Sequence, residues 1–264
     1  MKKYFVVGNP IEHSLSPKLH NFWIKNNSID AIYEKKFLSK DGLKNLILKV
    51  KKKKIHGINV TVPFKKTVIP YLDQLSTESK NTQSVNTIYL NNNKTIGHNT
   101  DIEGFERSIK ETKLDIKNKK ILILGAGGVA PSIIFALYKM KVSEIMITNR
   151  TKSKAEDLKG LFKNLKIVDW GKVPEFDIII NATSVGLKKG DEINLDFSKI
   201  GKNKFFYDLI YNPNETNFLK IGKNLGNRTE NGKLMFVYQA LAAFNVWHGI
   251  QPEINNEVIK LLDE

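Results

Sequence analysis

The sequence predicts a two-domain protein of the α/β class, and three observations carry this prediction. The 264 residues exceed the roughly 100 to 150 residues of a typical single domain. Short apolar strands alternate with helical patterns along nearly the whole chain. From about residue 119 the strands become continuously apolar, which is typical of a parallel sheet buried on both faces. We expect one domain over residues 1–101, completed by C-terminal helices at about 236–264, and a second domain over residues 102–235.

The first part of the chain alternates strands with helices. The expected strands are Tyr4–Val7, Ile32–Leu38, Gly57–Val62 and Ser84–Leu90. Between the first two, Ser16 and Pro17 are typical of a helix N-cap followed by proline at the first helical position. Asn91–Asn93 marks a turn, because asparagine tolerates the backbone conformations that turns require.

The second part has a strand–helix–strand rhythm. The expected strands are Ile121–Leu124, Glu144–Thr148, Lys166–Asp169, Asp177–Asn181 and Phe205–Ile210. The last long helical pattern covers Lys233–His248, and we expect this helix to pack back on the first domain.

A glycine-rich turn follows the strand Ile121–Leu124 directly. Its residues are Gly125, Ala126, Gly127, Gly128, Val129 and Ala130. They fit the pattern G-x-G-x-x-G/A between a strand and a helix, where glycines permit a tight turn and a close approach of pyrophosphate. The N-terminus of the following helix offers unpaired N–H groups to phosphates. The pattern therefore predicts a Rossmann-type, doubly wound domain that binds a dinucleotide.

The end of the next strand indicates which dinucleotide is bound. An NAD site usually places a carboxylate there, against the ribose 2′-hydroxyl. This chain has Asn149, Arg150 and Thr151 instead, with Lys154 close by. A guanidinium pairs well with a 2′-phosphate, so the expected cofactor is NADP.

Composition excludes several other kinds of site. The chain has no cysteine, which excludes disulfides, thiolate zinc sites and a cysteine nucleophile. Its five histidines show no H-x-x-H or H-E-x-x-H spacing, so we expect no metal site.

The net charge of +15 raises the alternative of a nucleic-acid-binding protein. Its lysines, however, are spread over the chain, and the densest run, Lys51–Lys54, ends an apolar-periodic segment as a solvated helix terminus does. No aromatic residues interleave with that run. We expect no nucleic-acid partner, and instead a field that attracts small anions.

Neither a membrane span nor a signal peptide is expected. The uncharged stretch Ile121–Tyr138 is interrupted by glycines and Pro131, and the apolar run near the N-terminus is too short for a signal peptide. We expect a cytoplasmic protein.

The strand that begins at Gly57 has a period of two. Ile58, Val60 and Val62 can face a core while Asn59 and Thr61 face the other way. Alternation alone leaves two interpretations open, a half-exposed strand and a strand that presents polar groups to a ligand.

Several motifs in a fixed order resemble those of the shikimate dehydrogenases. They are Ser14-Leu-Ser16-Pro, Asn59-Val-Thr-Val-Pro-Phe-Lys65, Val85-Asn86-Thr87, Asn99-Thr-Asp101, the glycine turn, Asn149-Arg-Thr151, Asn181-Ala-Thr183, Gln239-Ala and Trp247-His-Gly. The resemblance covers nearly the whole chain. It implies an NADPH-dependent reduction of 3-dehydroshikimate to shikimate in the biosynthesis of chorismate and the aromatic amino acids, by a monomer or homodimer.

The resemblance also implies roles for individual residues. Lys65 and Asp101 would form the catalytic pair, and Ser14 and Ser16 would hold the substrate carboxylate. The other substrate contacts would be Asn59, Thr61, Asn86, Tyr211 and Gln239, with Lys65 and Asp101 also touching the substrate. Thr183 and Gly232 would join the glycine turn and the loop of Asn149–Thr151 and Lys154 at the cofactor.

Three positions depart from the family pattern. Ile102 stands where glycine is usual, His98 where aspartate is common, and Lys233-Leu234 in place of a glycine-rich approach to Met235. These departures leave open whether quinate is also a substrate. A catalytically silent NADP-binding homologue is a further alternative, against which Lys65 and Asp101 speak.

Overall fold

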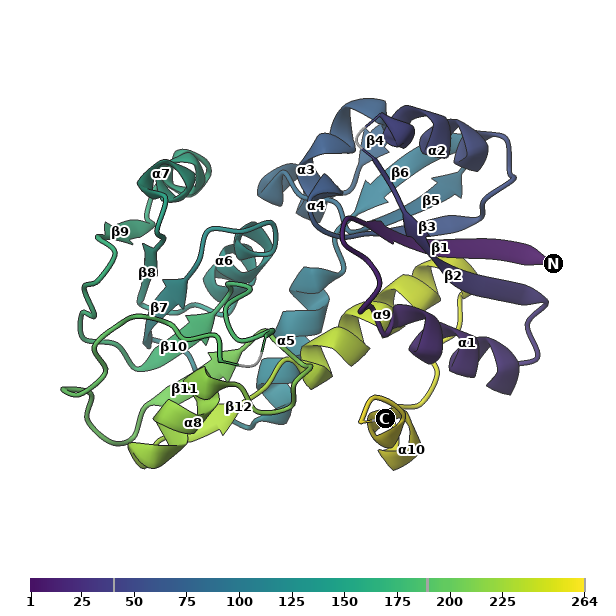
Figure 1. Cartoon of the computed structure of the whole chain (residues 1–264). Coiled ribbons are helices and arrows are strands. Elements are labelled where there is room, and N and C mark those ends of the chain that lie inside the picture. Colours follow the sequence, from purple (N-terminus) through teal and green to yellow (C-terminus); the bar gives the residue numbers. More distant parts are fainter. Residues whose placement is uncertain (40, 189, 264) are drawn as a thin grey trace. The chain divides into compact units, whose positions relative to one another are not determined.

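The computed structural model describes residues 1–39, 41–188 and 190–263, and the chain divides into two compact units (Figure 1). Unit 1 comprises Met1–Gly104 together with Val237–Glu264, and unit 2 comprises Phe105–Phe236. The helices α5 (Asp101–Glu111) and α9 (Lys233–His248) each begin in one unit and end in the other.

Unit 1 is built on a mixed sheet with the strand order β2-β1-β3-β5-β6-β4. Its strands are β1 (Lys2–Gly8), β2 (Ala31–Phe37), β3 (Gly57–Val60), β4 (Gln74–Leu75), β5 (Thr87–Asn91) and β6 (Lys94–His98). β1 pairs in parallel with β2 and β3, whereas β5 is antiparallel to both β3 and β6. Asn92 and Asn93, with φ of 47° and 60°, form the turn of the β5–β6 hairpin at the predicted place.

The helices of unit 1 bury one apolar stripe each. They are α1 (Ser16–Asn26), α2 (Gly42–Lys51), the short α3 (Phe64–Thr67), the 3-10 turn η1 (Ile69–Tyr71), α4 (Thr77–Thr82) and α10 (Asn256–Leu261). In α2 the periodic residues Leu43, Leu46, Ile47 and Val50 are buried, and the helix then runs into exposed lysines at 51–54. This lysine run is the solvated helix terminus that the pattern predicted.

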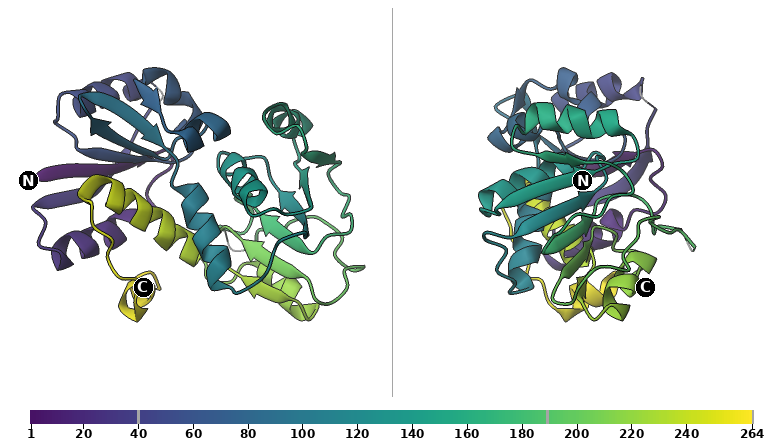
Figure 2. Two further views of the ribbon diagram at one scale, coloured as in Figure 1. Left: turned by 180° about the vertical axis from the view of Figure 1, so that it is seen from behind. Right: turned by 90° about the vertical axis from the view of Figure 1, so that its left-hand side faces the viewer.

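The C-terminal segment completes unit 1. The indole Nε1 of Trp247 in α9 donates a hydrogen bond to the Ile88 carbonyl, at 3.1 Å. A Cβ on Gly57 in β3 would collide with the same indole ring, so a glycine lets the helix lie close to the sheet. The helix α10 contacts α1 (Figure 2).

Unit 2 contains an entirely parallel sheet with the strand order β12-β11-β10-β7-β8-β9. Its strands are β7 (Lys120–Leu124), β8 (Glu144–Thr148), β9 (Lys166–Val168), β10 (Ile178–Asn181), β11 (Phe205–Asp208) and β12 (Arg228–Glu230). Starting from the central strand β7, the chain adds β8 and β9 toward one edge of the sheet. It then returns to the other side of β7 and adds β10, β11 and β12 toward the opposite edge. This is the strand order of a doubly wound dinucleotide-binding fold, and the predicted fold class is confirmed.

Both faces of this sheet are covered, as its apolar strands require. Leu122 and Leu124 pack in a cluster with Phe218 and Leu219 of α8 (Asn217–Asn224), whereas Ile121 and Ile123 point to the opposite face and are equally buried. The remaining helices of the unit are α6 (Ala130–Lys139) and α7 (Lys152–Leu161).

The structure corrects the sequence prediction at three strand ends and one cap. β11 ends at Asp208 and not at Ile210. β3 ends at Val60, so Val62 lies in a turn and is 55% exposed instead of facing the core. β5 begins at Thr87, not Ser84. The Val85 N–H donates to the carbonyl of Lys65 in α3, and the Asn86 N–H donates to the carbonyl of His98 at the end of β6. Ser16 is the first residue of α1 and does not cap it; the N-cap position belongs to Leu15.

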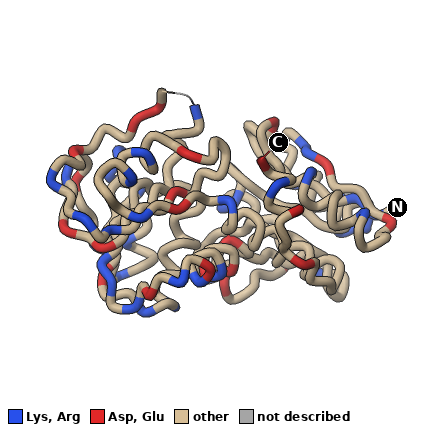
Figure 3. Tube along the Cα trace, turned by 90° about the horizontal axis from the view of Figure 1, so that it is seen from below, with Lys and Arg blue, Asp and Glu red and all other residues tan. Residues whose placement is uncertain are grey.

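No helix in the described ranges has the length and apolar character needed to cross a membrane. Lysine and arginine residues occur along most of the trace in both units, with acidic residues between them (Figure 3).

Candidate functional site

The Lys65 ammonium and the Asp101 carboxylate form a nearly buried ion pair in unit 1. Nζ of Lys65 lies 2.5 Å from Oδ2 of Asp101, and the two side chains are 11% and 8% exposed. Lys65 lies in α3, directly after the turn that ends β3, and Asp101 is the first residue of α5. Two residues that are far apart in sequence therefore form one charged pair with little access to water.

Asn86 holds the other oxygen of Asp101. Its Nδ2 donates to Oδ1 of Asp101 at 2.8 Å and to the Thr100 hydroxyl at 3.0 Å. Its Oδ1 accepts from the Thr100 N–H at 2.8 Å. The Asp101 N–H in turn donates to Oδ1 of Asn99, at 3.1 Å. These contacts fix the carboxylate so that one oxygen remains directed at Lys65.

Asn59 lies in β3 and Thr61 directly after it, and Asn59 is connected to the charged pair through Asn86. Oδ1 of Asn59 accepts a 2.6 Å hydrogen bond from the Tyr33 hydroxyl, and its Nδ2 donates to the Asn86 carbonyl and the Thr87 hydroxyl. The Thr61 N–H donates to the Val7 carbonyl at 2.9 Å. Asn59 is buried and Thr61 is half-buried, so the polar face of the strand carries a structured network and is not simply exposed to solvent.

Ser14 and Ser16 lie together at the start of α1. The Ser14 hydroxyl donates to the Ser16 hydroxyl at 3.2 Å and accepts from the Ser16 N–H at 3.3 Å. Hydroxyl groups next to the first N–H groups of a helix are suited to holding a carboxylate.

The glycine turn of unit 2 provides the geometry that a pyrophosphate requires. Gly125 has φ of +103°, and a Cβ there would lie 2.7 Å from Cγ2 of Thr183, so both conformation and space demand glycine. Gly127 is exposed. Within the described residues, the N–H groups of Gly127 and Val129 have no acceptor. Two backbone donors at the start of α6 are thus available to a phosphate, and the residues present fit the cofactor.

Asn149 connects the glycine turn to the next loop. Its Oδ1 accepts from the Ala126 N–H at 3.0 Å, and its Nδ2 donates to the Thr151 carbonyl at 2.7 Å. Arg150 and Lys154 are exposed, and neither side chain has an ion-pair or hydrogen-bond partner in the described part of the chain. The two cations therefore remain available to an anion at the end of β8.

Tyr211, Gly232 and Gln239 occupy the segments after β11 and β12. The Tyr211 ring stacks on Phe236, with centroids 4.3 Å apart. A Cβ on Gly232 would lie 2.5 Å from the carbonyl carbon of Leu209, so the backbones approach too closely for a side chain. Gln239 is half-buried in α9.

This close approach predicts the effect of a substitution. Gly232→Ala is expected to destabilise the protein by about 1 to 3 kcal/mol, because the new methyl group must push two backbone segments apart. Urea unfolding at equilibrium measures the change. Gly160→Ala is the control, since nothing lies within 4 Å of a Cβ there, and it should be neutral or stabilising. Equal stability of Gly232→Ala and the wild type would show that the two backbones separate freely.

Comparisons with known proteins show the family to which the chain belongs. Residues 6–88 match the shikimate dehydrogenase substrate binding domain, and residues 107–207 match the shikimate / quinate 5-dehydrogenase family. The shikimate dehydrogenase (NADP(+)) of Pelagibacter ubique is 58% identical over all 264 residues of both chains. The chain belongs to the shikimate dehydrogenase family.

Solved structures of shikimate dehydrogenases have the same fold. The Aquifex aeolicus protein superposes with a TM-score of 0.90 at 36% identity, covering 99% of this chain and 97% of its own. The Thermus thermophilus protein, in complex with NADP(H) and shikimate, superposes with a TM-score of 0.89 at 30% identity, covering 100% and 97%.

The departures from the shikimate dehydrogenase pattern leave the charged pair intact. Ile102 packs in the core at 2% exposed. The His98 ring Nδ1 makes a 2.9 Å hydrogen bond with the Ser76 hydroxyl, and burial lowers the pKa of His98. The Lys233 N–H donates to Oδ1 of Asn231 at 3.0 Å.

Sequence reasoning missed three polar residues that organise the candidate sites. Tyr33 and Thr100 hold Asn59 and Asn86, and Asp208 joins two strand ends of unit 2. Asp208 had a detectable signal, since it is a carboxylate directly after the apolar run Phe205–Tyr207. Thr100 lies within the motif Asn99-Thr-Asp101 but received no role. Tyr33 had no signal, because tyrosine is an ordinary strand residue.

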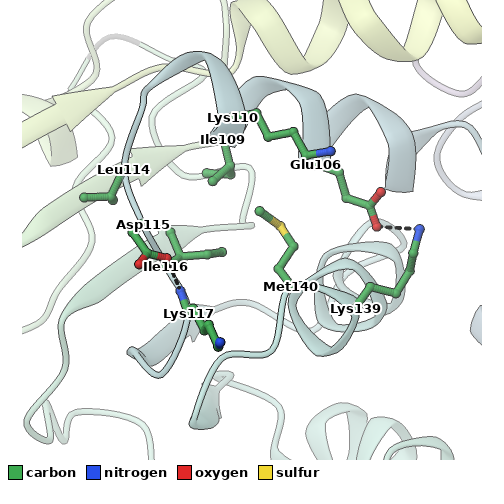
Figure 4. Close-up of a pocket in the computed structure, with 9 residues that line it drawn as sticks. All are labelled: Glu106, Ile109, Lys110, Leu114, Asp115, Ile116, Lys117, Lys139 and Met140. Atoms are coloured by element: carbon green, nitrogen blue, oxygen red, sulfur yellow. Dashed lines mark hydrogen bonds and ion pairs between the residues drawn. The ribbon is translucent and has the colours of Figure 1, made fainter.

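A separate hollow lies between the ends of α5 and α6 (Figure 4). Apolar side chains of Ile109, Ile116 and Met140 line it, and an ion pair of 2.6 Å between Glu106 and Lys139 closes one side. None of the predicted substrate or cofactor residues lines this hollow.

Proposed function

We propose that the protein is a shikimate dehydrogenase, which catalyses the reversible NADPH-dependent reduction of 3-dehydroshikimate to shikimate in chorismate biosynthesis. The observation that carries the proposal is the nearly buried Lys65–Asp101 pair, surrounded by hydroxyl and amide groups suited to a small anionic polyol. Full-length similarity to shikimate dehydrogenases supports it. We further propose that it acts in the cytoplasm as a monomer or homodimer.

Lys65 acts on the oxygen of the substrate carbonyl. When bound, NADPH supplies a hydride to the carbonyl carbon, and negative charge then develops on that oxygen. The Lys65 ammonium stabilises this charge and donates a proton to the oxygen. A ketone oxygen is too weakly basic to take a proton from an ammonium, but the developing alkoxide is basic enough. The Asp101 carboxylate orients the ammonium, and Asn86 holds the carboxylate. In the reverse direction, neutral Lys65 accepts the hydroxyl proton.

The remaining polar groups bind and orient the substrate. Ser14 and Ser16 hold the carboxylate at the start of α1, and Asn59, Thr61, Asn86, Tyr211 and Gln239 contact the other oxygens. The amide groups of Asn59 and Asn86 already have internal partners, so they meet a ligand in fixed orientations. A preorganised polar surface loses little entropy when the substrate binds.

The cofactor residues divide into two groups. The glycine turn, from Gly125 to Ala130, receives the pyrophosphate, with Thr183 and Gly232 bordering the rest of the cofactor. Arg150 pairs with the 2′-phosphate, Lys154 adds a second positive charge, and Asn149 and Thr151 shape the loop that carries them. No carboxylate stands at Asn149, Arg150 or Thr151 to repel the phosphate, so NADPH is favoured over NADH.

An absorbance assay at the nicotinamide band tests the proposal. The protein is incubated with shikimate and NADP, then with NAD in place of NADP, and then with quinate in place of shikimate. NADP reduction with shikimate is expected, with NAD a poor substitute. Turnover of quinate at a similar rate would extend the activity to a dual quinate/shikimate dehydrogenase. Tight NADP binding without turnover of either acid would identify a catalytically silent homologue.

The paired serines predict an effect on substrate affinity. Replacing both Ser14 and Ser16 with Ala removes two hydroxyl donors, each contributing about 0.5 to 1.5 kcal/mol, so the KM for shikimate should rise by about 5- to 150-fold. The kcat at saturating shikimate should fall much less, because the reacting oxygen is elsewhere. Initial rates over a range of shikimate concentrations measure both. The matched control is Ser39→Ala, an exposed serine of the same unit. An unchanged KM in the double variant would contradict the carboxylate assignment.

A further inference from the structure

Asp208 is a fully buried carboxylate at the carboxyl end of β11. Its Oδ2 accepts a 2.6 Å hydrogen bond from the Thr216 hydroxyl. Its Oδ1 accepts from Nδ2 of Asn181 and from the Ile210 N–H, both at 3.0 Å. All three partners donate to Asp208, so this arrangement satisfies an ionised carboxylate.

Asn181 connects Asp208 to Thr183, which packs against the glycine turn. Its Oδ1 accepts from the Thr183 N–H at 3.0 Å and from the Thr183 hydroxyl at 2.7 Å, while its Nδ2 also donates to the Val185 carbonyl. The methyl group of Thr183 in turn packs against Gly125. Oδ1 of Asp208 thus holds, through Asn181, the loop after β10, and this loop carries the proposed cofactor residue Thr183.

The other side of Asp208 holds the loop after β11. Ile210 and Thr216 bracket Tyr211, and Thr216 also caps α8 by accepting from the Leu219 N–H. Gly186 has φ of +117°, and a Cβ there would lie 3.2 Å from the Thr216 side chain. The loops after β10 and β11 therefore meet closely at the buried carboxylate.

A carboxylate in this position costs free energy. Burial raises the pKa of Asp208 to about 6, although the hydrogen bonds from Thr216, Ile210 and Asn181 oppose the shift. The titratable and charged groups on the surrounding elements are Tyr207 in β11, Arg228 and Glu230 in β12, Lys220 and Lys223 in α8, and Lys188, Asp191, Glu192, Tyr211 and Glu215 in the adjoining loops. Within the described residues no cation pairs with Asp208. A neutral residue of similar size would fold at lower cost.

We propose that Asp208 is a positioning residue for the cofactor: its buried carboxylate fastens the loop of Thr183 to the loop of Tyr211. The inference rests on the proposed function, because these loops border the cofactor only if NADPH binds at the glycine turn. Asp208 touches neither the substrate nor the cofactor, and acts through Asn181, Ile210 and Thr216.

Asp208→Asn tests the proposal, because it preserves the volume but replaces one acceptor with a donor. The KM for NADPH should rise about tenfold or more, and the KM for 3-dehydroshikimate should rise by a smaller factor, because the Tyr211 loop also contacts the substrate. Asp177→Asn is the matched control. Asp177 accepts from the Lys120 N–H at the amino end of β10, so it links neighbouring strands at the opposite end of the sheet. The KM of the Asp177→Asn variant for NADPH should equal that of the wild type.

The pH dependence separates positioning from a general structural role. The ratio of kcat/KM for NADPH between wild type and Asp208→Asn should be largest near pH 8 and fall toward one near pH 5, where Asp208 of the wild type is protonated. Titration of the 2′-phosphate affects both proteins and cancels in the ratio. A ratio near one at every pH would overturn the proposal.

Melting temperatures and a second pair of variants test whether a loss of NADPH affinity is caused by misfolding. Because the folded pKa of Asp208 lies above the unfolded one, its ionisation costs stability as the pH rises through about 6. Asp208→Asn should therefore melt no lower than wild type near pH 8. Thr216→Val deletes one donor and should raise the KM for NADPH, whereas Thr216→Ser keeps the hydroxyl and should restore it. Loss of substrate and cofactor affinity together, with a lowered melting temperature, would assign Asp208 a structural role only.

Failure of the proposed function gives a different result. If the wild type reduces no NADP with shikimate, the proposed function fails, and NADPH affinity is then measured by nicotinamide fluorescence. Equal NADPH affinity of the wild type and Asp208→Asn at every pH would overturn this inference, whatever the reaction.

Discussion

Lys65→Met is expected to lower kcat by about 10²- to 10⁴-fold, with the KM for shikimate within a few-fold of wild type. The substitution removes the ammonium that donates a proton to the developing alkoxide but leaves the binding groups of the pocket in place. Nζ of Lys65 already lies 2.5 Å from Asp101, so the loss affects a positioned charge. Steady-state rates in both directions, with saturating NADPH or NADP, measure the effect.

Two controls make this result interpretable. Lys66→Met alters the adjacent lysine, which is exposed, and should leave kcat unchanged. Lys65→Met also leaves a buried carboxylate without its partner, which can cost about 3 to 5 kcal/mol of stability. The double variant with Asp101→Asn removes that cost and should remain as slow as the single variant. A near-normal kcat would exclude Lys65 from the chemistry, and a large KM effect alone would make it a binding residue.

Arg150→Ala is expected to reduce kcat/KM for NADPH by about 10- to 150-fold, because a charge-assisted hydrogen bond contributes about 1.5 to 3 kcal/mol. NADH lacks the 2′-phosphate, so its kcat/KM should change little. The Arg150 guanidinium is exposed and has no protein partner among the described residues, which means that its removal breaks no internal contact. Initial rates with both cofactors at fixed ionic strength measure the difference, since such contacts are screened by salt.

Neighbouring cations provide the controls for Arg150. Lys154→Ala combined with Arg150→Ala should reduce kcat/KM for NADPH further than the single change. Lys152 pairs with Asp169 at 3.1 Å, so Lys152→Ala should have little effect. Equal losses with NADPH and NADH would show that Arg150 supports the loop or the adenine, and a wild type that prefers NADH would contradict the cofactor assignment.

The contacts of Asn149 exclude a simple switch toward NADH. An aspartate at Asn149 could supply an acceptor for a ribose hydroxyl. Its second oxygen, however, would face the Thr151 carbonyl, to which Nδ2 now donates at 2.7 Å. Two acceptors would oppose each other, so Asn149→Asp is expected to disturb the loop for both cofactors.

Strong local patterns predicted the fold well. Ile121–Leu124 and Glu144–Thr148 are continuous apolar strands, and the observed β7 and β8 match them within one residue. Helix α9 covers the predicted residues, from Lys233 to His248. In contrast, β4, β6 and β12 were not predicted. β12 consists of Arg228, Thr229 and Glu230, and it is a strand only because it pairs with β11 at the edge of the sheet.

The candidate site could be predicted only in part, because its geometry depends on tertiary contacts. Lys65 and Asp101 are separated by 36 positions, and charge spacing cannot bring them together. The fold does so through local hydrogen bonds: the Val85 N–H donates to the Lys65 carbonyl at 2.9 Å, and Asn86 then reaches Asp101. The family resemblance named the residues, but neither it nor the periodicity of β3 indicated that Tyr33 holds Asn59.

The division of unit 1 between the two ends of the chain affects the order in which the protein is made. Residues 1–104 leave the ribosome before unit 2, whereas Trp247, which packs against Ile88 and Gly57, is synthesised after unit 2. Unit 2 is continuous and can fold while translation proceeds. The unit begun first is therefore finished last, and during that interval the apolar surface later covered by α9 is open to chaperones and to proteases.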